Sequence, residues 1–406
     1  MNRNDNEQSH SGTMWGEGVC TVCGGQDSLD FLDIRGIPAQ DGVLWPTQAQ
    51  ALAAPRGDIT LSLCLQCGYA GNRTFQPELL RFTSYNVSLE YSPLYQAFIK
   101  SLASGLIERY NLRNKTILEI GCGNGYFLKT ICALGSNSGV GFDPSYTDLS
   151  ENDAQLQNIV FIQDYYSDRY AQHAGDLVCC RQVIDHLGSP KDFLQMVRAL
   201  IGNKTDTVVY FEVPNPERRL LQFMPWNVGY EHGSWFFPES FRLFFELCGF
   251  TVKNIAPCHH GDYLGIEAIP APPERTTEKP AVQEQISRWA TDLKSLASRF
   301  EKEVTAWKER LARMERERVR AIPWGAGEHG IGFLNILNIQ QLMPFIVDIN
   351  PGRVGKFLPG TGQHVVAPEF LGEYQPDLII VTNRTYQAEI KEHARKLGVE
   401  CDYLVL

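Results

Sequence analysis

The chain of 406 residues is 43% hydrophobic and 21% charged, and its formal net charge is −10. These values are ordinary for a globular protein and predict two to three domains. The acidic balance argues against a nucleic-acid partner, because phosphate contacts need clustered Lys and Arg. No apolar run reaches the roughly 20 residues that span a bilayer, so no membrane partner is expected. Residues 1–14 are polar and lack the apolar core of a signal peptide, which predicts a disordered leader and a cytoplasmic protein.

Residues 15–85 contain two matched Cys-x-x-Cys-Gly pairs, Cys20 with Cys23 and Cys64 with Cys67. Two thiolates from each pair complete a tetrahedral zinc site, and the following glycine permits a tight turn. Four thiolates leave no open coordination position, so we expect structural Zn2+ in a small N-terminal domain. The alternative is four unliganded thiols. The remaining cysteines stand mostly in apolar contexts, as expected of free buried thiols in a reducing compartment.

Residues 86–270 alternate between helical and strand patterns. An apolar stripe predicts a helix over residues 90–110. Further elements are strands at 116–120, 139–142, 159–162, 177–180 and 208–213, and a helix at 126–134. This alternation predicts an α/β fold with a doubly wound, largely parallel, Rossmann-like sheet.

Residues 271–320 are expected to form a Pro-rich linker followed by a long helix from about Ala281 to Arg320. The apolar residues of this helix recur every three or four positions. Such a stripe can pair in a homodimer, but we favour packing on the chain's own domains, so the protein is expected to be a monomer or a homodimer.

Residues 321–406 open with the turn Gly325-Ala-Gly327, and strands are expected at 344–348 and 377–382. This pattern predicts a C-terminal α/β domain. The turn either forms a second nucleotide site or supports one wall of a cleft, and we favour the second interpretation.

The first central strand runs into Glu119-Ile-Gly121-Cys-Gly123-Asn124-Gly125. Glycines here let the backbone turn tightly and approach a ligand closely. Asp143 closes the next strand, where a carboxylate can accept the hydroxyl groups of a ribose. The glycine spacing differs from the dinucleotide pattern G-x-G-x-x-G, so a plain NAD-binding turn is the less favoured alternative.

A second candidate site is Gly229-Tyr230-Glu231-His232, in the segment beyond the strand at 208–213. A Glu beside a His, among aromatic residues and after a parallel strand, is a plausible acid/base pair. The alternative is a surface loop with a chance pair of charged residues.

The glycine-rich turn resembles that of S-adenosylmethionine (SAM) dependent methyltransferases with a Rossmann-like core. The resemblance continues through residues 160–165, where the family places an acidic residue near the adenine, and through residues 176–190. It implies SAM as the cofactor, with Glu119 near its charged amino acid. The expected cofactor-binding residues are Glu119, Gly121, Gly123, Asn124, Gly125, Asp143, Asp164, Tyr165 and Gln182.

The cysteine pairs, the SAM motif and the Glu-His loop together resemble the sugar C-methyltransferases that act on nucleotide-linked ketosugars. Residues 325–327, 347–351 and 355–361 are similar to the C-terminal domain of that family, so the likeness spans nearly the whole chain. It implies that a base removes a proton next to a ketone, and that the carbon of the enolate attacks the methyl group of SAM. The expected catalytic residues are His232 as the base, Glu231 as its neighbour, Tyr230 and His186.

Three departures from the family pattern lie where a substrate would be held. Gly229 stands where the family has Tyr, residues 362–363 separate Pro-Gly-Thr from His364, and Asn383 follows Thr382 where the family has Trp-Asn. They keep open methylation of another small molecule at oxygen or nitrogen on the same scaffold. A non-catalytic SAM-binding protein is a third, less favoured hypothesis. Tyr85 or Phe82 is the candidate aromatic residue facing the substrate.

Overall fold

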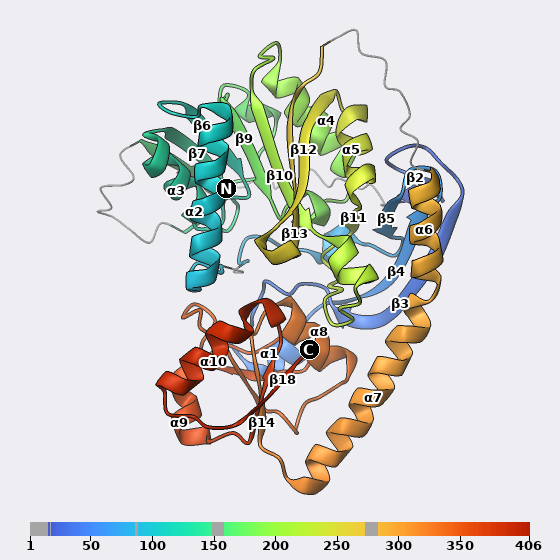
Figure 1. Cartoon of the computed structure of the whole chain (residues 1–406), viewed down its shortest axis with the longest axis vertical. Coiled ribbons are helices and arrows are strands. Elements are labelled where there is room, and N and C mark those ends of the chain that lie inside the picture. The colour runs from blue at the N-terminus through green and yellow to red at the C-terminus, as the bar shows by residue number, and fades with distance from the viewer. Residues whose placement is uncertain (1–14, 17, 86–87, 148–157, 273–282) are drawn as a thin grey trace, which may run out of the picture.

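The computed structural model describes residues 15–16, 18–85, 88–147, 158–272 and 283–406. Figure 1 shows a central sheet with helices on both faces, a second sheet below it, and a long helical segment along one side of the molecule. This arrangement confirms the predicted α/β class, with a Rossmann-like central domain between N-terminal and C-terminal parts.

The central sheet has seven strands in the order β12-β13-β10-β9-β6-β7-β8. Its elements are α2 (Pro93–Tyr110), β6 (Thr116–Ile120), α3 (Tyr126–Gly135), β7 (Ser138–Phe142), β8 (Ile159–Ile162), β9 (Leu177–Arg181), α4 (Pro190–Ile201), β10 (Val208–Pro214), α5 (Pro238–Leu247), β12 (Phe250–Cys258) and β13 (Tyr263–Pro270). Strands β8, β7, β6, β9 and β10 pair in parallel, whereas β13 is antiparallel to both of its neighbours. The strands expected from the sequence and the two expected helices are present, with small shifts at their ends.

Both faces of the central sheet are covered, which explains the continuous apolar runs of its strands. In β9, Leu177 and Cys179 pack with α2 and α3, while Val178 and Cys180 face α4 and α5 on the other side. Side chains alternate between the two faces of a strand, so one uninterrupted run serves two cores.

The N-terminal domain is an antiparallel sheet in the order β11-β5-β4-β3. Its strands are β3 (Ser28–Pro38), β4 (Arg56–Cys64), β5 (Tyr69–Asn72) and β11 (Ser234–Phe236), beside the short pair β1 (Trp15–Gly16) and β2 (Val19–Cys20). Strand β11 follows the predicted Glu-His loop in the chain and pairs with β5. The loop is therefore anchored to the N-terminal sheet as well as to the central one.

The segment between β3 and β4, which includes α1 (Gln48–Leu52), reaches the C-terminal domain. The Gly360 N–H donates to the Ala51 carbonyl at 2.8 Å, and Arg56 Nη2 donates to the Gly360 carbonyl at 2.9 Å. Trp45 and Phe357 form a β-bridge. The residues inserted between the two cysteine pairs thus tie the first domain to the last.

The expected long helix is two helices, α6 (Gln283–Lys294) and α7 (Leu296–Glu317), interrupted at Ser295. Ser295 Oγ donates to the Asp292 carbonyl at 2.9 Å, a local bond that competes with helix continuation. The buried apolar residues of α6 and the first turn of α7, including Leu296, join the core of the N-terminal and central domains. From Trp307 onward the buried apolar residues of α7 join the C-terminal core. The apolar stripe therefore packs on the chain's own domains, and its packing partner changes within α7.

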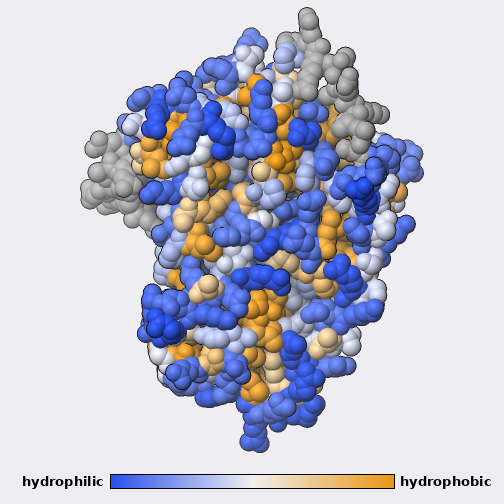
Figure 2. All heavy atoms as spheres, viewed as in Figure 1, coloured by the Kyte–Doolittle hydropathy of each residue, from blue (hydrophilic) through white to orange (hydrophobic). Residues whose placement is uncertain are grey.

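The C-terminal domain has five parallel strands in the order β16-β15-β14-β17-β18. Its elements are β14 (Ala321–Trp324), α8 (Glu328–Ile336), β15 (Phe345–Val347), β16 (His364–Val366), α9 (Leu371–Tyr374), β17 (Leu378–Val381), α10 (Gln387–Lys396) and β18 (Asp402–Val405). On the face shown in Figure 2, hydrophilic residues dominate and apolar residues emerge as narrow strips. Among the described residues no helix combines the length and apolar character needed to cross a bilayer.

Candidate active site

A cleft of about 1530 Å³ is lined by residues of all three domains. Single-ligand pockets are typically about 300–1000 Å³, so this cleft has room for a cofactor and a second molecule. Of the predicted catalytic and cofactor-binding residues, Gly125 and Tyr230 do not line it. The others that do are Glu119, Gly121, Gly123, Asn124, Asp143, Asp164, Tyr165, Gln182, His186, Glu231 and His232.

The glycine-rich turn after β6 has the conformation that its sequence demands. Gly121 has a φ of 72°, and a Cβ there would lie 2.1 Å from Val183 Cγ2. Gly123 has a φ of 54° with open space beside it, so a side chain would fill the cleft at this point. The Gly123 N–H donates to Asp143 Oδ2 at 2.8 Å, which joins the turn to the end of the next strand.

Glu119 is only 2% exposed, and its Oε2 has no hydrogen-bond partner among the residues that the structure describes. Burial raises the pKa of Glu119 to about 8, partly offset by Arg181. A buried carboxylate without a partner is costly unless a ligand supplies one. Its position on the cleft wall therefore fits the positively charged amino acid end of SAM.

The other predicted cofactor residues, except Gly125, also line the cleft. The side-chain amide of Asn124 contacts Ser88 and Glu90, and Gln182 Nε2 donates to Glu212 Oε1 at 3.2 Å. Asp164 accepts from the Tyr170 hydroxyl at 2.5 Å, while Tyr165 remains 54% exposed. Gly125 caps α3 with a φ of 80°, so its role in this structure is to turn the chain.

His232 lies between two carboxylates from different domains. Its Nδ1 is 2.7 Å from Asp185 Oδ2, and its Nε2 is 3.1 Å from Glu328 Oε1. Trp235 Nε1 donates to the His232 carbonyl at 3.0 Å, which fixes the backbone. Asp185, His186 and His232 bring ligand-type atoms within 4.8 Å of one another. With both ring nitrogens facing carboxylates, however, His232 is protonated on both and offers no lone pair to a metal.

The electrostatic state of His232 follows from these contacts. Burial favours the neutral ring, but the charge of Glu328 and the hydrogen bonds to Asp185 and Glu328 outweigh burial and raise the pKa of His232 to about 10. Burial likewise opposes the ionisation of Glu328, yet Arg219 and His232 hold its pKa well below the usual range. In this arrangement His232 is a cation at neutral pH.

Glu231 is 3% exposed and is held from the N-terminal domain. Its Oε1 accepts from the Tyr85 hydroxyl at 2.6 Å, and its Oε2 accepts from the Asp41 N–H at 3.1 Å. The Glu231 carbonyl is 2.9 Å from His186 Nδ1. Phe82 and Tyr85 both line the cleft, so both aromatic candidates face the site.

Tyr230, expected among the catalytic residues, packs beneath the site. It is 1% exposed and stacks on Phe75 with ring centroids 5.6 Å apart. Its hydroxyl accepts from the Gln76 N–H at 2.7 Å. This residue anchors the Glu-His loop to the N-terminal domain.

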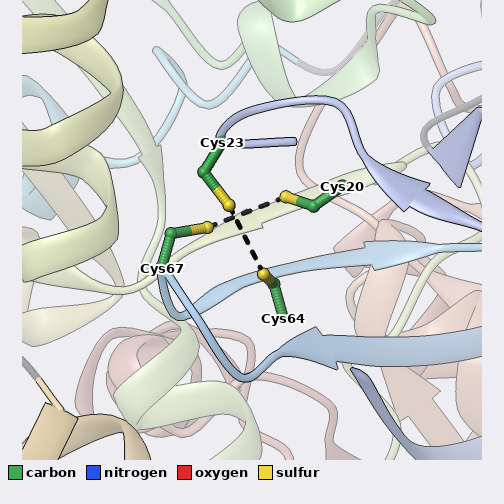
Figure 3. A group of neighbouring side chains, drawn as sticks. All are labelled: Cys20, Cys23, Cys64 and Cys67. Atoms are coloured by element: carbon green, nitrogen blue, oxygen red, sulfur yellow. Dashed lines mark hydrogen bonds between the residues drawn. The ribbon is translucent and has the colours of Figure 1, made fainter. Parts of the chain in front are cut away.

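The four predicted metal ligands come together in one cluster (Figure 3). Cys20 Sγ is 3.7 Å from Cys67 Sγ, and Cys23 Sγ is 3.6 Å from Cys64 Sγ. A tetrahedral zinc site with Zn–S bonds of about 2.3 Å places its sulfurs about 3.8 Å apart, so the cluster has the size of a four-thiolate zinc site. Gly24 and Gly68, which follow the pairs, have φ values of 78° and 73°. The cluster is compatible with zinc.

Asp185, Glu328 and Asp41 were not predicted as site residues. Asp185 directly precedes His186, but it lies behind His232 and its side chain does not line the cleft. Glu328 directly follows the Gly325-Ala-Gly327 turn, which was a visible signal of a functional loop. Asp41 stands 190 residues from Glu231 in the chain, and nothing in its local sequence marks it.

Comparisons with known proteins agree with this geometry. Residues 95–255 match a methyltransferase domain family, and residues 261–401 match the C-methyltransferase C-terminal domain family. The C-methyltransferase NovU of Streptomyces niveus is 24% identical over 393 residues, which cover 93% of this chain and 92% of that protein. A ubiquinone biosynthesis O-methyltransferase of Actinobacillus pleuropneumoniae serotype 7 (strain AP76) is 26% identical over 150 residues, covering 35% of this chain and 60% of its own.

Among solved structures, magnesium protoporphyrin IX methyltransferase (ChlM) from Synechocystis PCC 6803 with bound SAH aligns at 15% identity. The alignment covers 44% of this chain and 84% of that chain with a TM-score of 0.35, which is too low to support an argument.

The central fold, the turn around Glu119 and the match over residues 95–255 define a SAM-dependent methyltransferase. With the match over residues 261–401, the chain combines a methyltransferase domain with a C-methyltransferase C-terminal domain. These matches confirm the resemblance to SAM-dependent methyltransferases with a C-methyltransferase C-terminal domain.

Proposed function

We propose that the protein transfers the methyl group of SAM to a carbon atom next to the ketone of a small molecule, a nucleotide-linked ketosugar. The observation that carries this proposal is the pairing of His232 Nδ1 with the fully buried Asp185 beside the cofactor cleft. A carbon nucleophile needs a base to remove its proton, and a carboxylate on one imidazole nitrogen makes the other nitrogen more basic. The full-length likeness to a C-methyltransferase supports the same reaction.

In this proposal SAM supplies an electrophilic methyl group, and the chain's residues prepare the carbon that attacks it. His232, once neutral at Nε2, removes the proton next to the ketone. Asp185 stabilises the imidazolium that forms, and buried Glu231, fixed by Tyr85 and Asp41, sets the charge beside the ring. Glu119, Gly121, Gly123 and Asp143 hold the cofactor on the opposite wall. The volume of the cleft and the cations Arg219 and Arg353 on its wall suit a second, anionic ligand such as a nucleotide-linked sugar.

We also propose that Cys20, Cys23, Cys64 and Cys67 bind structural Zn2+. Four thiolates at tetrahedral spacing leave no position for a substrate, so the ion would fix the fold of the N-terminal domain. Its influence on catalysis would pass through β5 and β11 to the Glu-His loop.

The test is a turnover assay of zinc-replete protein with SAM and a panel of nucleotide-linked ketosugars, with the new methyl group located by NMR. A parallel assay replaces SAM with S-adenosylhomocysteine and follows exchange of the proton next to the ketone in D2O. Wild type should exchange and methylate that carbon. His232→Ala should lose both activities by about 10²–10⁴-fold, the usual contribution of a general base. Methylation at oxygen or nitrogen without exchange would overturn the proposal.

A further inference from the structure

We propose that Glu328 is a positioning residue of the C-terminal domain that occupies the working nitrogen of His232 and must leave it before the histidine can act as a base. This inference rests on the proposed function, because it concerns the same histidine. The protein thereby has a resting state, seen here, and a working state in which the Glu328–His232 contact is broken.

The contact involves the only nitrogen of the His232 ring that can take a proton from a substrate. Asp185 binds Nδ1 from behind the ring at 2.7 Å, and its side chain does not line the cleft. Nε2 is therefore the nitrogen left to take a proton from a bound molecule, and Glu328 Oε1 lies 3.1 Å from it. A substrate carbon and this carboxylate cannot both stand in front of Nε2.

The position of Glu328 is set by its place in the fold. It is the first residue of α8, immediately after the turn that follows β14. Arg219 Nη1 is 2.9 Å from both carboxylate oxygens, and the Gly229 N–H donates to Oε1 at 3.3 Å. These donors come from the central domain, so the carboxylate bridges the two domains across the cleft.

Further side chains surround the same histidine. The His186 ring lies tilted against it with ring centroids 4.8 Å apart, and Trp235 meets it edge-on at 5.9 Å. Beyond these, Asp41, Glu231 and Arg353 lie on the cleft wall, and Arg219 contacts Glu328. Asp185 and Glu328 are the two carboxylates at hydrogen-bond distance from the ring, and only Glu328 comes from the C-terminal domain.

The proton can be followed through one reaction cycle. In the resting state both ring nitrogens are protonated. When substrate displaces Glu328, the Nε2 proton passes to solvent and the ring becomes neutral. Nε2 then takes the proton from the substrate carbon, a C–C bond forms to the methyl group, and its C–S bond breaks to leave S-adenosylhomocysteine. His232 is again a cation and pairs with Glu328 as product departs.

The first experiment is an NMR titration of the histidine rings in the substrate-free protein, with the nine histidines labelled and His232 assigned from a His232→Asn variant. Wild-type His232 should stay protonated to about pH 10. Glu328→Gln should lower this midpoint by about one to two pH units, because one opposite charge at this distance shifts a pKa by about 1–3 units. Glu373→Gln, an exposed carboxylate of the same domain, should leave it unchanged.

If Glu328→Gln does not fold, Glu328→Asp is used for the same titration. It keeps the charge beside Arg219 but withdraws it from Nε2, so the midpoint of His232 should again fall. An unchanged midpoint in a folded variant of either kind would overturn the proposal.

The second experiment adds a nucleotide-linked ketosugar and S-adenosylhomocysteine to wild type at pH 8. Loss of the His232 charge on binding is expected, and the acid limb of the kcat/KM profile should move to lower pH in Glu328→Gln. If the ligand binds and His232 remains a cation, Glu328 does not leave and the inference fails, even if carbon methylation is found. If His232 responds as expected but no sugar is methylated, the substrate assignment fails instead.

Discussion

The hydroxyl groups of Tyr69 and Ser234 lie 2.8 Å apart and join β5 to β11 within the N-terminal sheet. Tyr69 stands two residues after Cys67 of the cysteine cluster, and Ser234 stands two residues after His232. A few residues of paired strand thus connect the cysteine cluster to the Glu-His loop.

Removal of one thiolate should therefore impair catalysis at a distance. Cys67→Ser is expected to lose zinc, to unfold at lower temperature and to lose most methyl transfer, because the binding free energy of a structural metal is also folding free energy. Binding of S-adenosylhomocysteine should persist, since its residues lie on the central sheet. Metal analysis, calorimetry and turnover assays would measure the three effects. Cys401→Ser, outside the cluster, is the matched control, and a zinc-free protein with full activity would contradict the prediction.

The hydrogen bond from Tyr85 to Glu231 offers a more local test. Tyr85→Phe removes a hydroxyl that lies 2.6 Å from a buried carboxylate. Hydrogen bonds to charged groups contribute about 1.5–3 kcal/mol, so kcat/KM should fall by roughly 10–100-fold while the affinity for SAM stays the same. Tyr374→Phe in the C-terminal domain should leave both quantities unchanged. If kcat/KM of Tyr85→Phe equals that of wild type, Tyr85 does not support Glu231.

The sequence predicts those parts of the site whose residues are close together in the chain. The turn at Gly121 and Gly123 could be predicted because a positive φ and close approach both demand glycine. The spacing within the two cysteine pairs likewise predicts the four-cysteine cluster. The central strands could be predicted because a run such as residues 208–213 is mostly apolar and needs no knowledge of its partners.

The partners of His232 and Glu231 could not be predicted in this way. Glu328 and Asp41 reach the site only because separate domains meet there, and domain contacts leave no periodic trace in a single sequence. The break at Ser295 could not be predicted either, because the apolar stripe is continuous across it and Leu293 and Leu296, on its two sides, belong to the same core. Tyr230 is expected at the site because it stands one position from the tyrosine of the resembling family, but Tyr230 and Glu231 lie in a turn, and the Tyr230 ring stacks on Phe75 instead.

Glu119 should control the affinity for SAM. Glu119→Gln keeps the shape of the side chain and removes its charge, so the Kd for SAM should rise roughly 10–100-fold. Because burial raises the pKa of Glu119 to about 8, the carboxylate becomes fully charged only as pH rises through that value. The advantage of wild type over the variant should therefore grow between pH 7 and pH 9. Calorimetric titrations of both proteins, with Glu108→Gln as an exposed control, would show this difference, and parallel curves would refute it.

A side chain at position 229 would occupy the same space as the carboxyl group of Asp41, beside the Glu-His loop. A Cβ at position 229 would lie 2.4 Å from Asp41 Oδ2, a buried atom without a hydrogen-bond partner among the described residues. Burial and the charges of Glu231 and Glu328 raise the pKa of Asp41 well above its usual range, because an ionised carboxylate here would be desolvated beside two other anions. Gly229→Ala is therefore expected to destabilise the protein by about 1–3 kcal/mol, the usual effect of overpacking.

In an Asp41→Ala background the same substitution should cost little, because the clashing atom is gone. A double-mutant cycle on the free energy of unfolding would give the coupling directly. The cycle also bears on the substrate, since Gly229 stands where the resembling family has a tyrosine. If the two substitutions are additive, Asp41 does not occupy the space vacated at position 229, and its proximity has no role in shaping this part of the cleft.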